Sequence, residues 1–313
     1  MNMHDIFTPI FFFTLAFCVE SACNYNTPVV GILAQHSDSQ YGTSYIAADY
    51  VNFYSSAGAQ VIPVFINQPQ SYYEALFENL NAVVFPGGES EIGKSSYYNN
   101  ALYFMQKSKE VWETKKEVFP IFGTCEGFQT IVYFINSPVD PLSNTNGTSS
   151  VNLPVKFTEK VKTSVFFGDA PDYVISQLEK SVTANNHELS LLMSTYNSSP
   201  NLQQAINVLA TSVDGNGIEF AAIIESSTGL PWFATQFHPE KSVFEFKLSY
   251  INHEPETIRA MQYIADILIT QSRKSCHKFQ THQELHAQDI NNYPLTYIST
   301  ASKDFQSIYY FNN

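Results

Sequence analysis

The chain has 313 residues, of which 44% are hydrophobic and only 14% are charged. This composition is typical of a globular protein and excludes an extended disordered chain, and the length suits one large α/β domain or two small ones. With 29 acidic and 16 basic residues the formal net charge is −13, which argues against nucleic acid as a partner. No apolar run is long enough to predict a transmembrane helix.

The N-terminus carries a short apolar stretch, Ile6–Val19, which small residues follow up to Ala22. This pattern predicts a secretory signal peptide over residues 1–22, and a mature domain over residues 23–313. The stretch lacks a preceding Lys or Arg and contains Pro9, so a buried N-terminal helix is the alternative.

Strands and helices alternate through the first half of the chain. In order, we predict a strand over Val29–Gln35, a helix over Ser44–Ala57, a strand over Gln60–Phe65, a helix over Tyr72–Asn79, a strand over Ala82–Phe85, a helix over Tyr97–Thr114, a strand over Val118–Phe122 and a helix over Glu126–Ile135. Such alternation predicts an α/β fold, a three-layer sandwich with a central, mostly parallel sheet. Sites in such sheets lie beyond the carboxyl ends of the strands.

The second half of the chain is less regular. The segment Ser137–Val151 is rich in Ser, Asn, Pro and Gly and predicts a surface loop. Shorter strands are predicted near Val155–Thr158, Asn207–Thr211, Ile218–Ile224 and Trp232–Phe237, before an amphipathic helix over Glu256–Thr270. The sequence after Arg273 predicts no element. There is no internal repeat and no linker, so we expect one domain.

Two further patterns concern the compartment. Glycosylation sequons at Asn146 and Asn197 fit a secreted protein. Of the four cysteines, Cys18 and Cys23 lie at or before the predicted cleavage point, and we expect Cys125 and Cys276 both to stay free. No Cys or His spacing typical of a zinc site is present, so we predict no metal.

A cysteine lies in an unusual setting between Gly123 and Gly127. An apolar strand ends just before Gly123, and an apolar helix follows Cys125 directly. This strand–turn–helix pattern is the cysteine counterpart of the nucleophile elbow, in which glycines keep the backbone uncrowded. The helix N-terminus favours the thiolate. The pattern predicts Cys125 as a nucleophile, with a buried structural cysteine as the alternative.

Two other motifs can supply its partners. His238-Pro239-Glu240 follows a short strand, so His238 can reach a cysteine at a neighbouring strand end while Glu240 fixes its tautomer. The pair Gly87-Gly88 follows the strand Ala82–Phe85 and can present backbone N–H groups to an oxyanion. An ordinary surface turn is the alternative for each motif.

Together these motifs resemble the class I glutamine amidotransferase-like superfamily, which has a flavodoxin-like fold, and within it the gamma-glutamyl hydrolases. The segments that carry the resemblance, in chain order, are PVVGILAQ, FPGG, FGTCEGFQ, ANNHELSL, FHPEKSVFEF, INHEPETIRAMQYIADILITQSRK and FQSIYYF. The resemblance covers nearly everything from Thr27 to the end.

The resemblance implies a cysteine hydrolase that cleaves the gamma-glutamyl bonds of folate poly-gamma-glutamates through a thioester. Cys125 would be the nucleophile, His238 the proton carrier and Glu240 its orienting partner, and the backbone N–H groups of Gly88 and Glu126 would hold the oxyanion. The implied substrate-binding positions are Tyr50, Gly87, Gln129, His187 and Lys241. No cofactor is implied, and the location would be a lysosome or vacuole, or outside the cell. A homodimer is left open, and no membrane association is expected after signal removal.

Two positions depart from the family pattern. Gln129 stands where these hydrolases usually have Glu, and Glu126 where an apolar residue is usual; a carboxylate there would disfavour the thiolate. A glutaminase, a hydrolase of small gamma-glutamyl amines, and an impaired secreted binding protein therefore stay open. Because the protein and a polyglutamate tail are both acidic, we expect a local cation to bind the tail, Lys241 first and Lys94 second, unless both are solvated surface charges. Lower pH is expected to charge His187.

Overall fold

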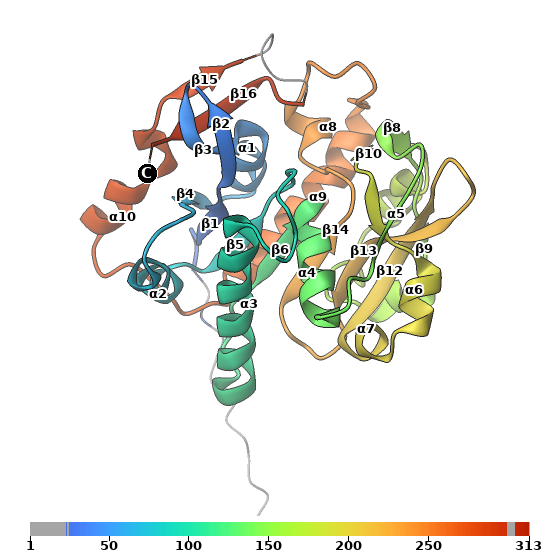
Figure 1. The fold of residues 1–313 in the computed structure, drawn as a ribbon, viewed down its shortest axis with the longest axis horizontal. Coiled ribbons are helices and arrows are strands. Elements are labelled where there is room, and N and C mark those ends of the chain that lie inside the picture. The colour runs from blue at the N-terminus through green and yellow to red at the C-terminus, as the bar shows by residue number, and fades with distance from the viewer. Residues whose placement is uncertain (1–22, 24, 299–303, 313) are drawn as a thin grey trace, which may run out of the picture.

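The computed structural model describes residues 23, 25–298 and 304–312, so the predicted signal peptide lies outside the described residues (Figure 1). Within them an eight-stranded sheet forms the centre of the molecule. From edge to edge its strands are β4 (Gln60–Val64), β1 (Val29–Leu33), β5 (Ala82–Phe85), β6 (Ile121–Thr124), β14 (Trp232–Thr235), β13 (Glu219–Ser226), β12 (Ile206–Val213) and β9 (Lys156–Phe157). The first five are mutually parallel, and the last three add on antiparallel.

Helices cover both faces of this sheet. One face carries α1 (Ala48–Ser56), α5 (Asp172–Leu178), α8 (Lys241–Phe244) and α9 (Pro255–Ser272). The other carries α2 (Gln70–Asn79), α3 (Ser96–Lys115), α4 (Glu126–Asn136), α6 (Met193–Ser198) and α7 (Pro200–Ala205), with α10 (His282–Gln288) beside them. The predicted three-layer α/β fold is therefore confirmed. None of the helices in the described part of the chain is long and apolar enough to span a membrane.

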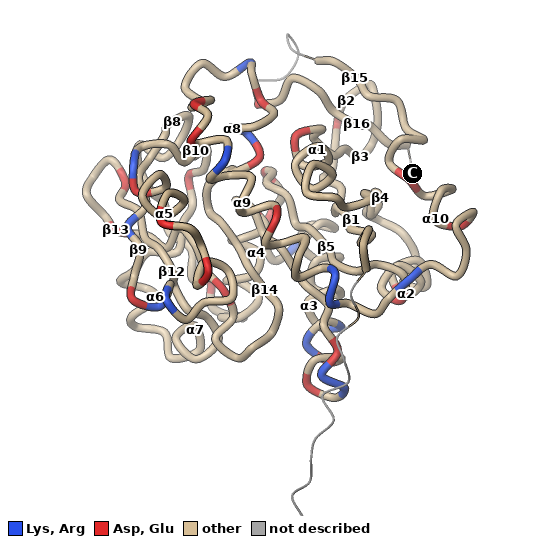
Figure 2. Tube along the Cα trace, turned by 180° about the vertical axis from the view of Figure 1, so that it is seen from behind, with Lys and Arg blue, Asp and Glu red and all other residues tan. Residues whose placement is uncertain are grey.

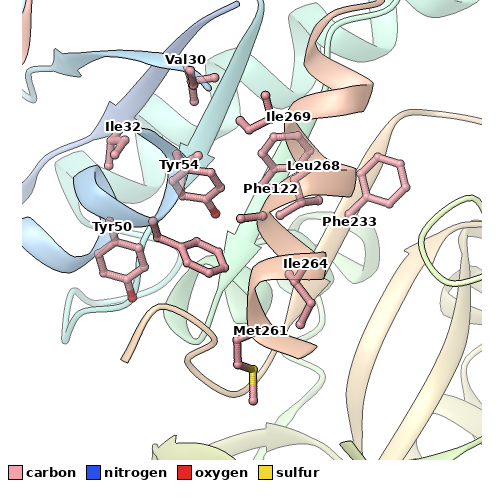
Figure 3. Close-up of a cluster of buried hydrophobic side chains, with 14 of the residues drawn as sticks. Val30, Ile32, Tyr50, Tyr54, Phe122, Phe233, Met261, Ile264, Leu268 and Ile269 are labelled. Atoms are coloured by element: carbon pink, nitrogen blue, oxygen red, sulfur yellow. The ribbon is translucent and has the colours of Figure 1, made fainter. Parts of the chain in front are cut away.

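The parallel strands are apolar on both sides because both faces of the sheet are covered. Alternate residues of β1 separate into the two cores: Val30 and Ile32 pack with α1 and α9, whereas Val29 and Leu33 face α2 and α3. Figure 3 shows the first of these cores, where Tyr54 of α1 lies among Val30, Phe122 and Ile269. Because β4, β1, β5, β6 and β14 run in the same direction, the loops that follow them all start from one edge of the sheet.

Charged residues lie mainly outside these cores. Figure 2 shows basic residues interspersed with acidic ones along α3. Two ion pairs of this helix, Lys107–Glu110 and Lys109–Glu113, balance their charges locally. Such exposed pairs contribute little to stability.

The sequence analysis did not predict the second sheet, which is antiparallel. It contains β2 (Gln35–Ser39), β3 (Gly42–Ala47), β16 (Ser307–Phe311) and β15 (Leu295–Tyr297). The predicted helix over Ser44–Ala57 is therefore wrong in its first four residues, which lie in β3. These residues pair with β16, where Ile308 lies opposite Ala47. Because the two strands are separated by most of the chain, no local pattern in the sequence indicates their pairing. The strand predicted over Val29–Gln35 likewise ends at Leu33.

The predicted loop Ser137–Val151 also contains strands. β7 (Leu142–Asn144) pairs with β11 (Leu189–Leu191), and β8 (Ser149–Leu153) pairs with β10 (Thr183–Asn186). Two short 3-10 helices, η1 (Glu159–Thr163) and η2 (Ile290–Asn292), complete the elements. These polar strands were hidden because their partners come about forty residues later and bury few apolar side chains.

The expectation that Cys276 stays free is wrong. Cys276 forms a disulfide with Cys23, their Cα atoms 5.2 Å apart. The N-terminal segment runs beside the end of α9, where the Tyr25 N–H donates to the Arg273 carbonyl oxygen at 3.2 Å. Because 253 residues separate the two cysteines, their proximity depends on the whole fold. Among the described residues, Cys125 is the free cysteine.

Candidate active site

Three neighbouring strand ends meet at the carboxyl edge of the parallel sheet. In the register of β5, β6 and β14, Phe85 lies opposite Gly123, and Thr124 lies opposite Thr235. The loops that follow these strands carry Gly87-Gly88, Cys125 and His238. The structure thus brings together the three motifs that the sequence singled out, at the edge where α/β folds hold their sites.

Cys125 occupies a strained turn between β6 and α4. Its φ is 54° and its ψ −105°, a backbone conformation that residues other than glycine rarely adopt. Its N–H donates to the Thr235 carbonyl oxygen at 2.9 Å, which ties the turn to β14. A Cβ atom at Gly127 would overlap the Phe85 carbonyl oxygen, and one at Gly123 would lie 2.6 Å from the Gly127 carbonyl carbon. Both glycines are therefore required by close backbone approach.

His238 and Glu240 form a buried pair behind the sulfur. His238 Nδ1 lies 2.7 Å from Glu240 Oε1, and the two side chains are 5% and 1% exposed. The backbone N–H of His238 donates to the Ala184 carbonyl oxygen at 2.8 Å, which fixes the backbone of the turn. With Nδ1 engaged by the carboxylate, Nε2 is the ring nitrogen left for Cys125.

The charge state of His238 follows from its neighbours. Burial alone would lower the pKa of His238, but the charges of Glu240 and Cys125 outweigh it and raise this pKa to about 9. The imidazolium is thus favoured at neutral pH, next to a cysteine at a helix N-terminus. Both features are typical of the surroundings of a nucleophilic cysteine.

Tyr50 and Gly87 complete the contacts around His238. The Tyr50 hydroxyl accepts the Gly87 N–H at 2.8 Å and lies 3.2 Å from His238 Nδ1. A Cβ atom at Gly87 would lie 2.8 Å from His238 Cε1 and 3.2 Å from Cys125 Cβ. Only a glycine fits there, and Tyr50 holds it against the two reactive side chains.

Glu126 directly follows Cys125, and its side chain is buried. Its Oε2 accepts hydrogen bonds from Gln35 Nε2 at 3.1 Å and from the Ser90 N–H at 3.2 Å. Burial raises the pKa of Glu126 to about 8, so the side chain is a neutral acid below that pH. The family departure at this position therefore places no fixed negative charge beside Cys125 in neutral solution.

His187 and Gln129 lie near the site but outside the cavity lining. His187 bonds Asn185 and Ser190, both at 3.1 Å, and Gln129 Nε2 donates to the Leu189 carbonyl oxygen at 2.8 Å. Burial, together with nearby His238, lowers the pKa of His187 to about 3. The expectation that mildly acidic pH charges His187 is therefore wrong, because its ring is buried and has no carboxylate partner in the part of the chain that the structure describes.

A cavity of about 840 Å³ opens over Cys125 and His238. Four rings from the turn between β2 and β3, from β3 and from the C-terminal segment line it, and we call them the aromatic wall: Tyr41, Tyr45, Phe305 and Tyr310. The carboxylates that line the cavity are Asp38, Glu89, Glu91 and Asp304. The cavity is wide enough for an extended substrate, and its lining is predominantly acidic.

Lys241 is the single lysine or arginine among the described residues of this lining. It is not the solvated charge that its sequence position allowed, because the residue is 1% exposed. Its Nζ donates to the Asp304 carbonyl oxygen at 2.8 Å and lies 4.4 Å from the centre of the Phe305 ring. Lys94, the second candidate, lies outside the lining and pairs with Glu91 at 2.5 Å.

The two sequons differ in setting. Asn146 is exposed between β7 and β8, whereas Asn197 is exposed within α6. Both side chains are on the surface, where a glycan would meet no buried group.

The structure adds site residues that the sequence analysis did not name. Gln35 lies just beyond β1 at the same carboxyl edge, so its position after an apolar strand was an available signal. Asn186 lies beside the nucleophile, its carbonyl oxygen 3.9 Å from Cys125 Sγ. The aromatic wall left no signal, because its rings come from opposite ends of the chain. No group of three His, Cys, Asp or Glu side chains in the described ranges is placed to hold a metal ion.

Comparisons with known proteins agree with this geometry. The model of the family Peptidase C26 matches residues 28–240. A gamma-glutamyl hydrolase from Rattus norvegicus is 33% identical over 290 residues, which cover 91% of this chain and 90% of the relative. Gamma-glutamyl hydrolase B from Dictyostelium discoideum is 32% identical over 299 residues, 92% of this chain and 84% of the relative.

A solved structure supports the fold alone. The glutaminase domain of Trypanosoma brucei CTPS is similar with a TM-score of 0.50 at 12% identity, over 79% of this chain and 94% of that domain. The family model and the two relatives show more than the fold. This chain belongs to the peptidase C26 family and is a hydrolase.

Proposed function

We propose that the protein hydrolyses gamma-glutamyl amide bonds through a thioester at Cys125. The observation that carries the proposal is the arrangement of Cys125 at a glycine-flanked elbow beside the buried pair of His238 and Glu240. The names of the relatives support the choice of bond. This arrangement is that of a nucleophile, a proton carrier and an orienting carboxylate.

The reaction proceeds in two halves. Cys125 Sγ attacks the gamma-carbonyl carbon and forms a C–S bond, while His238 holds the thiol proton. His238 then gives this proton to the amide nitrogen as the C–N bond breaks, and the amine leaves. Water attacks the thioester and one of its protons passes to His238. The C–S bond then breaks, the acyl half of the substrate leaves with a free gamma-carboxyl group, and the proton returns from His238 to restore the thiol.

The remaining residues hold the substrate and the transition state. The N–H of Glu126, the first residue of α4, has no partner within its helix, and with the Gly88 N–H it would hold the oxyanion. Tyr50 acts by positioning Gly87 and His238, which its hydroxyl contacts. Gln129 and His187 lie outside the lining and support the Asn185–Ser190 segment through their hydrogen bonds, and Lys241 supplies positive charge inside the lining.

We propose the gamma-linked glutamate tails of folates as the substrate, in keeping with the family resemblance and with the aromatic wall, which suits a flat ring system. The acidic lining favours a second candidate, a small gamma-glutamyl amine with a neutral or cationic leaving group. Asp38, Glu89 and Glu91 would repel a long anionic tail and attract such a group.

Three substrates separate these readings: folate pentaglutamate, free glutamine and a gamma-glutamyl amine. The protein and its Cys125→Ala variant are incubated with each, and the products are followed by mass spectrometry. Shortened folate tails made only by the unsubstituted protein support the main proposal. Turnover of glutamine alone would identify a glutaminase, and no turnover of any substrate would indicate a binding protein.

We also propose that residues 1–22 are a signal peptide that is removed, that residues 23–313 act as one hydrolase domain, and that the mature protein is lysosomal, vacuolar or secreted. The disulfide Cys23–Cys276 supports this, since disulfides persist in oxidising compartments. The exposed sequons Asn146 and Asn197 would then carry glycans. N-terminal sequencing of the secreted protein, with and without glycosidase treatment, tests both points.

A further inference from the structure

We propose that Glu126 is a positioning residue whose carboxyl group anchors the Gly87–Ser90 loop over Cys125. The inference rests on the proposed function, because the loop matters through the oxyanion donor at Gly88. It assigns a role to the side chain that departs most from the family pattern. Glu126 thus becomes part of the device that shapes the site, and it makes the site sensitive to alkaline pH.

The contacts of Glu126 join three separate segments. Its carboxyl group starts from α4 and accepts hydrogen bonds from Gln35, which follows β1, and from the Ser90 backbone. Ser90 Oγ in turn donates to Gln35 Oε1 at 2.7 Å, which closes a small network. The loop after β5 has no regular secondary structure here, so these bonds set its course.

Gly88 fits against this network. A Cβ atom at Gly88 would lie 2.6 Å from Glu126 Oε2 and would overlap the Gln35 amide. The backbone that carries the proposed oxyanion donor therefore rests directly on the carboxyl group. If that group were absent, the loop would lose its support on the side opposite Tyr50.

The charge of Glu126 matters because its surroundings are acidic. The titratable groups that interact with it electrostatically are the Glu89 carboxylate on the loop and the hydroxyls of Tyr45 on β3 and Tyr97 on α3, and Cys125 precedes it in the chain. Both tyrosines stay neutral because burial raises their pKa values. Glu126 Oε1 is buried without a hydrogen-bond partner among the described residues, so an ionised carboxylate would be compensated at Oε2 alone. Ionisation above pH 8 would oppose both the thiolate and the oxyanion.

The test compares Glu126→Ala, Glu126→Gln and a matched control, Glu225→Gln. Glu225 is another buried carboxyl group that accepts a backbone N–H, from Phe166 at 3.1 Å, and it lies outside the cavity lining. We measure kcat and KM for a gamma-glutamyl dipeptide from pH 5 to 10. Glu126→Ala should lower kcat at pH 6 by about 10- to 100-fold with a smaller change in KM, because the oxyanion donor is misplaced.

Glu126→Gln should keep most of this kcat at pH 6, because an amide oxygen can still accept from Ser90. In the unsubstituted protein kcat should fall above about pH 8, as Glu126 ionises. In Glu126→Gln this fall should move towards pH 9, where His238 loses its proton. Glu225→Gln should leave the profile unchanged. A wild-type kcat in Glu126→Ala, or an unmoved fall in kcat in Glu126→Gln, would overturn the proposal.

A second measurement does not depend on the substrate. Iodoacetamide modifies the thiolate, and mass spectrometry of the Cys125 peptide gives its alkylation rate. Glu126→Gln should react faster than the unsubstituted protein at pH 9, but equally fast at pH 6. If the ratio of the two alkylation rates, variant over unsubstituted protein, were the same at pH 6 and pH 9, the inference would be refuted. This result does not require cleavage of any gamma-glutamyl substrate, so the inference and the proposed function can fail separately.

Discussion

The catalytic edge and the aromatic wall face each other across one cavity, but they are held in different ways. Cys125, His238 and Glu240 are at most 4% exposed as residues and are fixed by bonds to neighbouring strands. The wall contains exposed groups, such as Tyr41 at 47%, and it depends on the pairing of β3 with β16. The residues of the proposed chemistry are thus built into the sheet, whereas those of the proposed substrate recognition depend on an added layer.

This difference teaches which substitutions should affect which kinetic parameter. Changes at the catalytic edge should lower kcat, because they act on the reacting atoms. Changes in the cavity lining should raise KM, because they act on binding. The following variants test this division, from the largest expected effect to the smallest.

Cys125→Ala should abolish turnover, a loss of at least about 10³-fold, because no other group forms the thioester. The fold should be retained, since a methyl group fits the space of the thiol. Turnover is measured with a gamma-glutamyl dipeptide, and the acyl-enzyme of the unsubstituted protein is trapped by rapid acid quench. A loss of only a few-fold, or an acyl group on another residue, would reject the nucleophile.

His238→Ala should cost nearly as much, about 10²- to 10⁴-fold in kcat, because the proton carrier of both halves is gone. KM should change less. His253→Ala is the control, since His253 is outside the cavity lining and bonds only the Ser242 carbonyl oxygen among the described residues. Similar losses in the two variants would contradict a catalytic role for His238.

Glu240→Gln should be milder, about 10-fold in kcat, because orientation is weakened while the proton carrier remains. Glu240 raises the pKa of His238, so in a Glu126→Gln background, where the loss of the His238 proton sets the fall in kcat near pH 9, adding Glu240→Gln should move that fall to lower pH. The raised pKa also stabilises the fold below pH 6.5, and this contribution is lost as pH rises to about 9. The difference in Tm between pH 6 and pH 9 should therefore be smaller in the Glu240→Gln variant. An unchanged difference would show that Glu240 does not set the pKa of His238.

Lys241→Met should act mainly on KM, by a few-fold for a diglutamate and more for a pentaglutamate, if its charge attracts the anionic tail. Because Lys241 also bonds Asp304 and contacts Phe305, retention of the wall is checked by crystallography. Lys94→Met is the matched control, an exposed lysine that pairs with Glu91 outside the lining. Equal KM changes for both tail lengths would show that Lys241 does not bind the tail.

The sequence alone determined the parallel half of the fold. The apolar strands before Gly87 and Cys125 and the helices between them carry local patterns, and most of them were predicted within about three residues. The elbow was also readable, because close backbone approach requires glycine at Gly123 and Gly127. Once parallel strands are predicted, their carboxyl ends must share one edge, so Cys125 and His238 were expected together.

Only the tertiary structure decided the rest. The disulfide Cys23–Cys276, the pairing of β3 with β16 and the aromatic wall join segments separated by more than 250 residues, which no local period reports. Charge states also depend on three-dimensional surroundings. Burial keeps His187 uncharged at mildly acidic pH and Glu126 protonated at neutral pH, although isolated side chains of both types behave otherwise. A sequence names the groups that can react, but desolvation and neighbouring charges, which exist only in the fold, decide their protonation.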